Sequence, residues 1–277
     1  MIIIFLKHTN SLPKTFTIFE ALAKILNSMV VLGIDIGGSG MKGGLIDSFA
    51  GEMVSERFRI PTPISRHPNE MAQVFKEIVN HFNYKGLVGC GFPSVIKHGV
   101  CKDPGNLHND WKNLNVEDLF SKACGSPVTV INDADAAGYA VMNYGIGKGK
   151  KGLVIIITIG TGLGSGVFLD GQLIPNFELG QIPYRKHNKI ENWAAASAKD
   201  RKNLSFKKWG KRFNKFLELV ELLIRPDHII LGGGTSDDFD QFKKWIKIET
   251  PVVPAQLGNT AGIVGAACAV IHKAPKD

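Results

Sequence analysis

The sequence predicts a mixed α/β fold made of two related halves. In two places an apolar run typical of a buried strand ends in a glycine-rich turn and is followed by another strand. The first run is Val31–Ile36, and its turn is Gly37–Gly40. The second run is Leu153–Ile159, and its turn is Gly160–Gly166. Because the whole unit recurs, we expect two halves that face one shared site.

The first glycine turn has the composition of a phosphate site. Glycines let the backbone turn sharply and bring its N–H groups close to a ligand. Asp35 lies on the strand just before the turn, while Ser39 and Lys42 supply a hydroxyl and a cation. This set favours a phosphate with Mg²⁺, and Asp35 is the candidate metal ligand, partly through water.

A dinucleotide site is the main alternative for this turn. Gly38-x-Gly40-x-x-Gly43 fits the dinucleotide fingerprint, which requires a helix directly afterwards. Met41–Ile46 contains two adjacent glycines and is a poor helix start. A turn at Asp47–Gly51 and a strand-like stretch at Met53–Ile60 follow. A strand meander is therefore predicted, and the dinucleotide interpretation is rejected.

Composition sets limits on size, partners and compartment. The chain has 277 residues, of which 44% are hydrophobic, so it can form two modest domains. Its net charge of +8 favours anionic partners. Four scattered cysteines without a CxxC pair predict reduced thiols in a cytoplasmic protein and argue against structural zinc.

The ends of the chain carry no predicted site. No apolar run approaches the ~18 residues that a membrane helix needs, so no membrane partner is expected. Residues 1–28 are predicted to be an extension outside the core, because the strand of the first turn begins right after Met29.

Polar groups follow other predicted strands. After Val128–Ile131 come Asn132, Asp133 and Asp135, which open a helix and are either functional carboxylates or ordinary N-caps. The loop Asn106–Trp111 suits a sugar or a plain surface connection. A strand at Asp227–Leu231 ends in three more glycines.

The assembled motifs resemble the ROK family of sugar kinases, and within it most closely the bacterial polyphosphate glucokinases. The likeness covers most of residues 29–270 in family order. The matching segments are GIDIGGSGMKGG, VINDADAAG, TIGTGLGSG, LIPNFELG, WAAASAKD, RPDHIILGGG and TPVVPAQLGNTAGIVGAA.

The resemblance implies the actin-like ATPase (ribonuclease H-like) fold, with two α/β domains around a central cleft. Residues 29–134 would form the smaller domain, on which the C-terminal helix 260–277 packs back. Residues 135–259 would form the larger one. A homodimer is usual in such families.

The resemblance also implies roles for individual residues, with Asp133 as the catalytic base. The residues predicted to bind sugar are Asn106, Asn132, Asp133, Glu178, Gln181 and Glu191. Those predicted for donor phosphates are Asp35, Gly37, Gly38, Ser39, Gly40, Lys42, Thr158, Gly160, Thr161 and Gly162. The adenosine of ATP would lie at Gly232, Gly233 and Gly234.

Three positions depart from the family pattern. Gln181 replaces a histidine that contacts the sugar, so weaker or altered sugar binding is expected. Ser94 stands where a glycine usually follows the proline. The segment before the second sugar-binding glutamate has no cysteine for the zinc that many ROK kinases carry, a trait shared with polyphosphate glucokinases.

The predicted function is transfer of a phosphoryl group from polyphosphate, and also from ATP, to the 6-hydroxyl of glucose, with Mg²⁺. The alternatives are an ATP-dependent hexokinase for another sugar, and a sugar-binding regulator. We expect no nucleic-acid partner, because regulators of this family carry an N-terminal helix-turn-helix domain for which 28 residues are too few.

The donor prediction rests on a basic run. Lys199 to Lys215 holds eight basic residues and one acid and continues into an apolar-faced helix, Phe213–Ile224. Such a face is either a solvated surface or a guide for a long polyanion. The proposed polyphosphate strip consists of Lys207, Lys208, Lys211 and Arg212.

Overall fold

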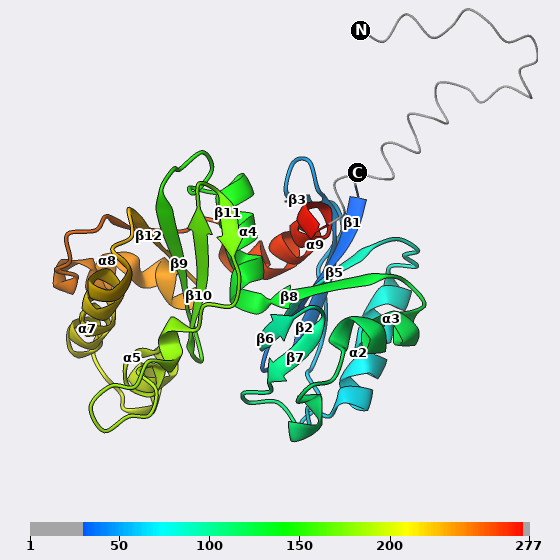
Figure 1. The fold of residues 1–277 in the computed structure, drawn as a ribbon, viewed down its shortest axis with the longest axis horizontal. Helices are drawn as coiled ribbons and strands as arrows, with labels where there is room; N and C mark the ends of the chain where they lie inside the picture. Colours follow the sequence, from blue (N-terminus) through cyan, green and yellow to red (C-terminus); the bar gives the residue numbers. More distant parts are fainter. Residues whose placement is uncertain (1–29, 274–277) are drawn as a thin grey trace, which may run out of the picture.

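Two sheets lie side by side in the structure, a computed structural model that describes residues 30–273 (Figure 1). Helices cover the outer face of each sheet, and two more helices run between the sheets. The predicted N-terminal extension, 1–28, lies outside the described residues.

The first sheet is organised around the first glycine turn. Strands β1 and β2 form an antiparallel hairpin across it, and β5 and β8 add parallel to β1. The strand order is β3-β2-β1-β5-β8, with β4 also pairing with β2. The strands are β1 (Val30–Ile36), β2 (Met41–Asp47), β3 (Glu52–Met53), β4 (Phe58–Ile60), β5 (Val88–Phe92) and β8 (Val128–Asn132).

The second sheet repeats this arrangement around the second glycine turn. Its order is β11-β10-β9-β12-β13, with an antiparallel hairpin followed by parallel strands. The strands are β9 (Leu153–Ile159), β10 (Leu163–Leu169), β11 (Gln172–Ile174), β12 (His228–Gly232) and β13 (Val252–Pro254). The matching orders confirm the two related halves, and the β1–β2 hairpin confirms that no dinucleotide motif is present at the first turn.

Amphipathic helices cover the outer faces, as their periodicity predicts. Helices α2 (Pro68–His81) and α3 (Val116–Cys124) pack on the first sheet, where Phe75 and Phe120 stack in the core. Helix α7 (Phe206–Ile224) packs on the second sheet through Trp209, Phe213 and Phe216, beside the short α8 (Phe239–Phe242) (Figure 1).

Short elements fill the connections. They are the hairpin β6 (Val95–Lys97) and β7 (Val100–Asp103), helices α5 (Glu191–Ala194) and α6 (Ala196–Arg201), and the 3-10 turns η1 (Asn109–Trp111), η2 (Leu179–Gln181), η3 (Gly234–Asp238), η4 (Lys243–Trp245) and η5 (Gly258–Thr260).

Helices α4 (Asp133–Tyr144) and α9 (Ala261–Lys273) run between the sheets (Figure 1). Helix α9 approaches its neighbours at three glycines. A Cβ added at Gly33 or Gly89 would meet the backbone carbonyl of Ile263 or Ala266, and one at Gly265 would meet that of Ala136. The predicted small-residue helix therefore packs closely on both β1 and β5 and on α4. The exact domain boundaries stay a prediction.

One predicted strand is interrupted. The stretch Met53–Ile60 forms two short strands, β3 and β4, instead of one. Between them the Ser55 side chain accepts a hydrogen bond from the Leu45 backbone N–H at 2.9 Å. This side-chain hydrogen bond takes the place of a backbone hydrogen bond between strands.

Two other expectations concern cysteines and membranes. All four cysteines are free thiols, and Cys90, Cys101 and Cys268 are buried. Among residues 30–273, no helix has both the length and the apolar character to cross a bilayer.

We predict that Gly89→Ala destabilises the fold. The new methyl group would lie 2.9 Å from the Ala267 backbone nitrogen and even closer to the Ala266 carbonyl, so α9 would have to move. The free energy of unfolding should fall by about 1–3 kcal/mol in thermal or urea denaturation.

The matched control is Gly234→Ala, because an added Cβ there meets nothing within 4 Å. This control should change the unfolding free energy by less than about 0.5 kcal/mol. Equal stability of the two variants would contradict the close packing of α9.

Candidate functional site

Asp133 occupies the first position of helix α4, at the end of strand β8. Asn132 is the N-cap, and its side-chain oxygen accepts from the backbone N–H groups of Ala134 at 2.9 Å and Asp135 at 3.1 Å. Since Asn132 caps the helix, the Asp133 carboxylate is not needed for that role. It is half-buried and can meet a substrate.

The surroundings of Asp133 raise the pKa of its carboxyl group to about 7. Burial is the largest cause, followed by the negative charge of Asp35; a hydrogen bond from the Ala134 N–H opposes them, and Glu178 and Asp135 add smaller increases. A carboxyl group that titrates near neutral pH is suited to accept a proton from a hydroxyl.

Asp135 has a different, structural position. Its side chain is buried, and Oδ2 accepts a hydrogen bond from the Asn176 N–H at 3.0 Å. The Asn176 side chain in turn bonds the N–H and carbonyl of Ile96, both at 2.9 Å. Asp135 therefore holds the segment that leads to Glu178.

Four of the predicted sugar-binding residues gather beside Asp133. The Asn132 side-chain amide lies 3.5 Å from Glu178 Oε1, and the Gln181 side chain hydrogen-bonds Glu178. Burial, followed by the charge of Glu191, raises the pKa of Glu178. This group offers carboxylate and amide atoms, the usual ligands of sugar hydroxyls.

Asn106 lies in the exposed loop before η1. Its backbone carbonyl accepts a hydrogen bond from the Arg66 side chain. Ser94 is buried close to Asn132, whose amide donates to the Ser94 carbonyl at 3.2 Å. The Ser94 hydroxyl donates to the carbonyl of Asp103. The extra hydroxyl is thus accommodated by a hydrogen bond across the base of the β6–β7 hairpin.

The first glycine turn is closed by a hydrogen bond from Gly37 N–H to the Gly40 carbonyl at 3.1 Å. The Thr62 hydroxyl donates to the Gly37 carbonyl at 2.6 Å, and Gly38 and Ser39 are exposed. Lys42 lies 3.3 Å from Asp35. Burial raises the pKa of Asp35 despite this cation.

The donor set around Asp35 fits Mg²⁺. The metal prefers hard oxygen ligands and is commonly held by one or two carboxylates together with substrate phosphates. The negative charge of Asp35 raises the pKa of the Asp133 carboxyl group, and a divalent cation at Asp35 would relieve that repulsion. Asp35 would hold the ion, directly or through water.

The second glycine turn mirrors the first. Its Gly160 N–H donates to the Gly162 carbonyl at 3.1 Å, and Ser197 of α6 donates to the Thr161 carbonyl at 2.6 Å. Glu191 Oε2 accepts from the Leu163 N–H at 3.1 Å. A predicted sugar ligand is therefore tied directly to a predicted phosphate turn. Thr158 is the next-to-last residue of strand β9, just before this turn.

Two arginines at the first turn were not predicted from the sequence. Arg59 donates to the Ser39 carbonyl at 2.7 Å, and Arg66 donates to the carbonyls of Asn106 at 2.7 Å and Gly38 at 3.5 Å. Only the strand pairing of β4 with β2 could have indicated Arg59, and no local pattern marks Arg66.

The predicted adenosine site is a narrow pocket. Its lining includes Thr158, Gly232, Gly233, Ser236 and Leu257, from the second sheet, η3 and the chain before α9. Gly234 begins η3 just beyond it. The enclosed part of this pocket has a volume of about 20 Å³, room for a water molecule, whereas Gly233 and Gly234 are exposed to solvent.

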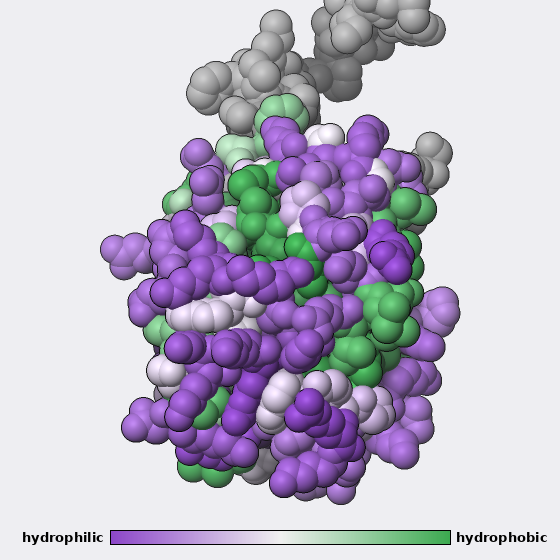
Figure 2. All heavy atoms as spheres, turned by 90° about the vertical axis from the view of Figure 1, so that its left-hand side faces the viewer, coloured by the Kyte–Doolittle hydropathy of each residue, from purple (hydrophilic) through white to green (hydrophobic). Residues whose placement is uncertain are grey.

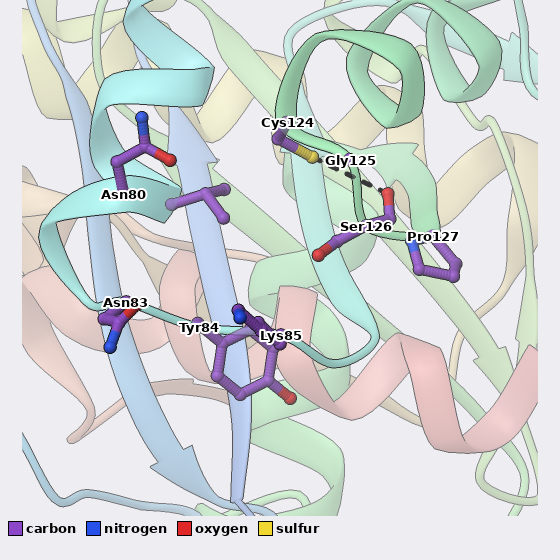
Figure 3. A pocket seen from close by; sticks show the side chains of 9 residues that line it. Asn80, Asn83, Tyr84, Lys85, Cys124, Gly125, Ser126 and Pro127 are labelled. Atoms are coloured by element: carbon purple, nitrogen blue, oxygen red, sulfur yellow. Dashed lines mark hydrogen bonds between the residues drawn. The ribbon is translucent and has the colours of Figure 1, made fainter.

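A larger pocket, of about 490 Å³, lies between the ends of α2 and α3 (Figure 3). Tyr84, Lys85 and Ser126 are among its lining residues, and Cys124 donates to the Ser126 carbonyl at 3.6 Å. None of the predicted site residues lines this pocket, so we do not assign the reaction to it.

One cluster of possible metal ligands occurs among the described residues, at His67, His108 and Asp110. His67 Nδ1 accepts from the Asn69 N–H at 3.3 Å, and His108 Nδ1 accepts from the Asp110 N–H at 3.2 Å. Both nitrogens thus cap helical turns, and His67 Nε2 lies 3.1 Å from Asp110. These contacts account for the cluster without a metal.

The basic run lies on α6 and α7, on a side of the molecule that is largely hydrophilic (Figure 2). Lys207, Lys208 and Lys211 are exposed as predicted. Arg212 is half-buried: its guanidinium lies over the Trp193 ring at 5.3 Å and donates to the Trp193 carbonyl at 3.3 Å, so its part in the strip stays a prediction. Lys215 pairs with Glu218 at 2.6 Å.

Similar proteins agree with this arrangement. The ROK family profile matches residues 31–178. A polyphosphate glucokinase of Mycobacterium tuberculosis is 42% identical over 240 residues, which cover 86% of this chain and 90% of that protein.

Two solved structures resemble most of the chain. The inorganic polyphosphate/ATP-glucomannokinase of Arthrobacter sp. strain KM has a TM-score of 0.84 and 40% identity, covering 88% of this chain and 99% of that one. A ROK family glucokinase of Streptomyces griseus, in complex with glucose and AMPPNP, has a TM-score of 0.75 and 25% identity, covering 86% and 98%. The predicted actin-like ATPase fold is confirmed, and the chain belongs to the ROK family.

Proposed function

We propose that this protein is a glucokinase that transfers a phosphoryl group from inorganic polyphosphate to the 6-hydroxyl of glucose. The observation that carries the proposal is Asp133, whose pKa is raised to about 7 beside Asn132 and Glu178. The similarity to the mycobacterial polyphosphate glucokinase supports the choice of donor and sugar.

In the proposed reaction Asp133 accepts the proton of the 6-hydroxyl. The hydroxyl oxygen then attacks the terminal phosphorus, the bond to the rest of the chain breaks, and the shortened polyphosphate leaves with the electron pair. Asn132, Glu178, Gln181 and Glu191 would hold the sugar so that this hydroxyl faces the donor. Positioning of this kind supplies much of the catalysis in phosphoryl transfer.

The two glycine turns and Lys42 would stabilise the charge on the transferred group through fixed donors. Bound Mg²⁺ near Asp35 would neutralise negative charge on the donor phosphates. Closure of the two halves over glucose would exclude water, which otherwise competes as the acceptor.

The arrangement of the binding residues favours polyphosphate over ATP as the phosphoryl donor. The enclosed pocket at the predicted adenosine site would not hold a nucleobase by itself, so the base of ATP would lie over the exposed Gly233 and Gly234. Helix α7, which carries the exposed lysines of the strip, packs on α5 through the Trp209 indole, which donates to the Ala194 carbonyl at 2.8 Å. Ser197 of the adjoining helix α6 contacts the second glycine turn. ATP is the second candidate donor, in view of the dual donor named for the Arthrobacter enzyme.

The free thiols support a reducing, cytoplasmic compartment. A homodimer is proposed from the family resemblance. Asp133 lies next to the predicted sugar-binding residues Asn132 and Glu178, where a catalytic base is needed. We therefore favour an enzyme over a sugar-binding regulator.

We predict that Asp133→Asn keeps the fold and glucose binding but lowers kcat by at least ~10²-fold, because the amide cannot accept the hydroxyl proton. Initial rates with glucose and polyphosphate measure kcat, and calorimetry measures glucose binding. Asp135→Asn is the contrasting variant: its main effect should be a lower melting temperature. Turnover of Asp133→Asn near that of the wild type would move the role of base away from Asp133.

The activity should rise with pH through about 7. Asp133 acts only when it is ionised, and since its pKa is raised to about 7, the active fraction is lost as the pH falls below that value. A plot of kcat/KM against pH reports this group in the free enzyme, with roughly a tenfold fall for each pH unit on the acid side. A profile that is flat from about pH 5 to about pH 8 would contradict the assignment.

We predict that Lys208→Glu with Lys211→Glu raises KM for polyphosphate by at least about tenfold and flattens its salt dependence, because a long polyanion loses contacts with the strip. KM for glucose should not change. Lys148→Glu with Lys151→Glu, two exposed lysines in the loop after α4, is the charge-matched control. If both pairs behave alike, the strip is only a solvated face.

A further inference from the structure

Arg59 is fixed against the first glycine turn. It lies on β4 opposite Lys42 of β2, and it donates to the Ser39 carbonyl at 2.7 Å. A Cβ added at Gly40 would come within 2.6 Å of the guanidinium carbon. The absence of a side chain at Gly40 therefore allows this arginine to lie directly on the turn.

Arg66, seven residues after Arg59, also contacts the first glycine turn. Its backbone is left-handed, with φ of 52°, which is unfavourable for an arginine. The buried Trp111 donates from its indole nitrogen to the Arg66 carbonyl at 2.8 Å and fixes this conformation. The guanidinium then reaches the carbonyls of Gly38 and Asn106.

The charges of these two arginines are not balanced locally. Within residues 30–273, no carboxylate forms an ion pair with Arg59 or Arg66, whereas Lys42 pairs with Asp35. A guanidinium has five N–H donors. The hydrogen bonds to carbonyls use one donor of Arg59 and two donors of Arg66. Planar donors with spare N–H groups beside a phosphate turn suit a further phosphate group.

We propose that Arg59 and Arg66 bind phosphate groups of the polyphosphate donor that lie next to the transferred one. The inference rests on the proposed function and names the part of the donor that the first half of the molecule holds. Both arginines belong to segments of the first half, whereas the narrow nucleotide pocket is lined by α4, the second sheet and η3. The extended chain of the donor would thus cross the first glycine turn, away from the predicted adenosine site.

The test compares Arg59→Gln, Arg66→Gln and the double variant with the wild type. Direct binding of long-chain inorganic polyphosphate, without glucose, is measured by calorimetry over a series of salt concentrations. Each substitution should raise Kd and KM for polyphosphate about tenfold, the effect of one lost charge-assisted contact. The slope of log Kd against log salt should fall by about one for each arginine. KM for glucose should stay unchanged.

Arg59→Lys, which keeps the charge but loses the planar fork, should recover part of the affinity. Lys76→Gln removes an exposed charge on α2 and serves as the control. Arg59→Gln leaves the left-handed backbone at Arg66 untouched, so it remains informative if the double variant melts at a lower temperature.

Unchanged polyphosphate binding in the variants would overturn the inference. A rise in KM for glucose alone would also overturn it, because Arg66 would then be a positioning residue for the Asn106 loop. Failure of the proposed function looks different. If the wild type binds polyphosphate but does not phosphorylate glucose, the acceptor is wrong while the binding series still decides the role of the arginines. If the wild type binds no polyphosphate, both proposals fail.

Discussion

The contact of helix α9 with α4 and the first sheet is the constraint on which the site depends. Gly265 lies against the Ala136 carbonyl on α4, and Gly89 lies against the Ala266 carbonyl, so backbone touches backbone on both sides. The start of α9 also reaches the site, because a Cβ added at Gly262 would lie 2.7 Å from the Asp35 carboxyl carbon. This packing leaves little freedom in the position of Asp133, at the start of α4, relative to Asp35.

That fixed spacing has an electrostatic consequence. Asp133 is partly withdrawn from water and lies among negative charges, which favours its protonated form and makes it a base near neutral pH instead of a permanently ionised carboxylate. The same withdrawal would be costly without compensation. The Ala134 N–H at the start of α4 supplies part of it for Asp133, Lys42 supplies it for Asp35, and Mg²⁺ with the donor would add to it during the reaction.

The elements with strong local patterns were predictable from the sequence. The apolar runs gave β1 and β9, the glycines gave the two turns, and the periodicity of α7 gave its buried face. Contacts between distant segments were not predictable. Arg59 and Arg66 donate hydrogen bonds to backbone carbonyls of the first turn, contacts that no sequence pattern indicates. Arg212 lies over the Trp193 ring and is only partly exposed to water. Residue type alone could not show these partners.

The central claim is that the two glycine turns and Asp133 serve a polyphosphate-dependent phosphorylation of glucose. The most direct measurement is formation of glucose 6-phosphate by the purified full chain with Mg²⁺, compared between long-chain polyphosphate and ATP as donors. The account predicts phosphorylation with polyphosphate, at a higher kcat/KM than with ATP, because the exposed lysines of the strip and the arginines at the first turn can bind a long polyanion. Turnover with ATP and none with polyphosphate would contradict it.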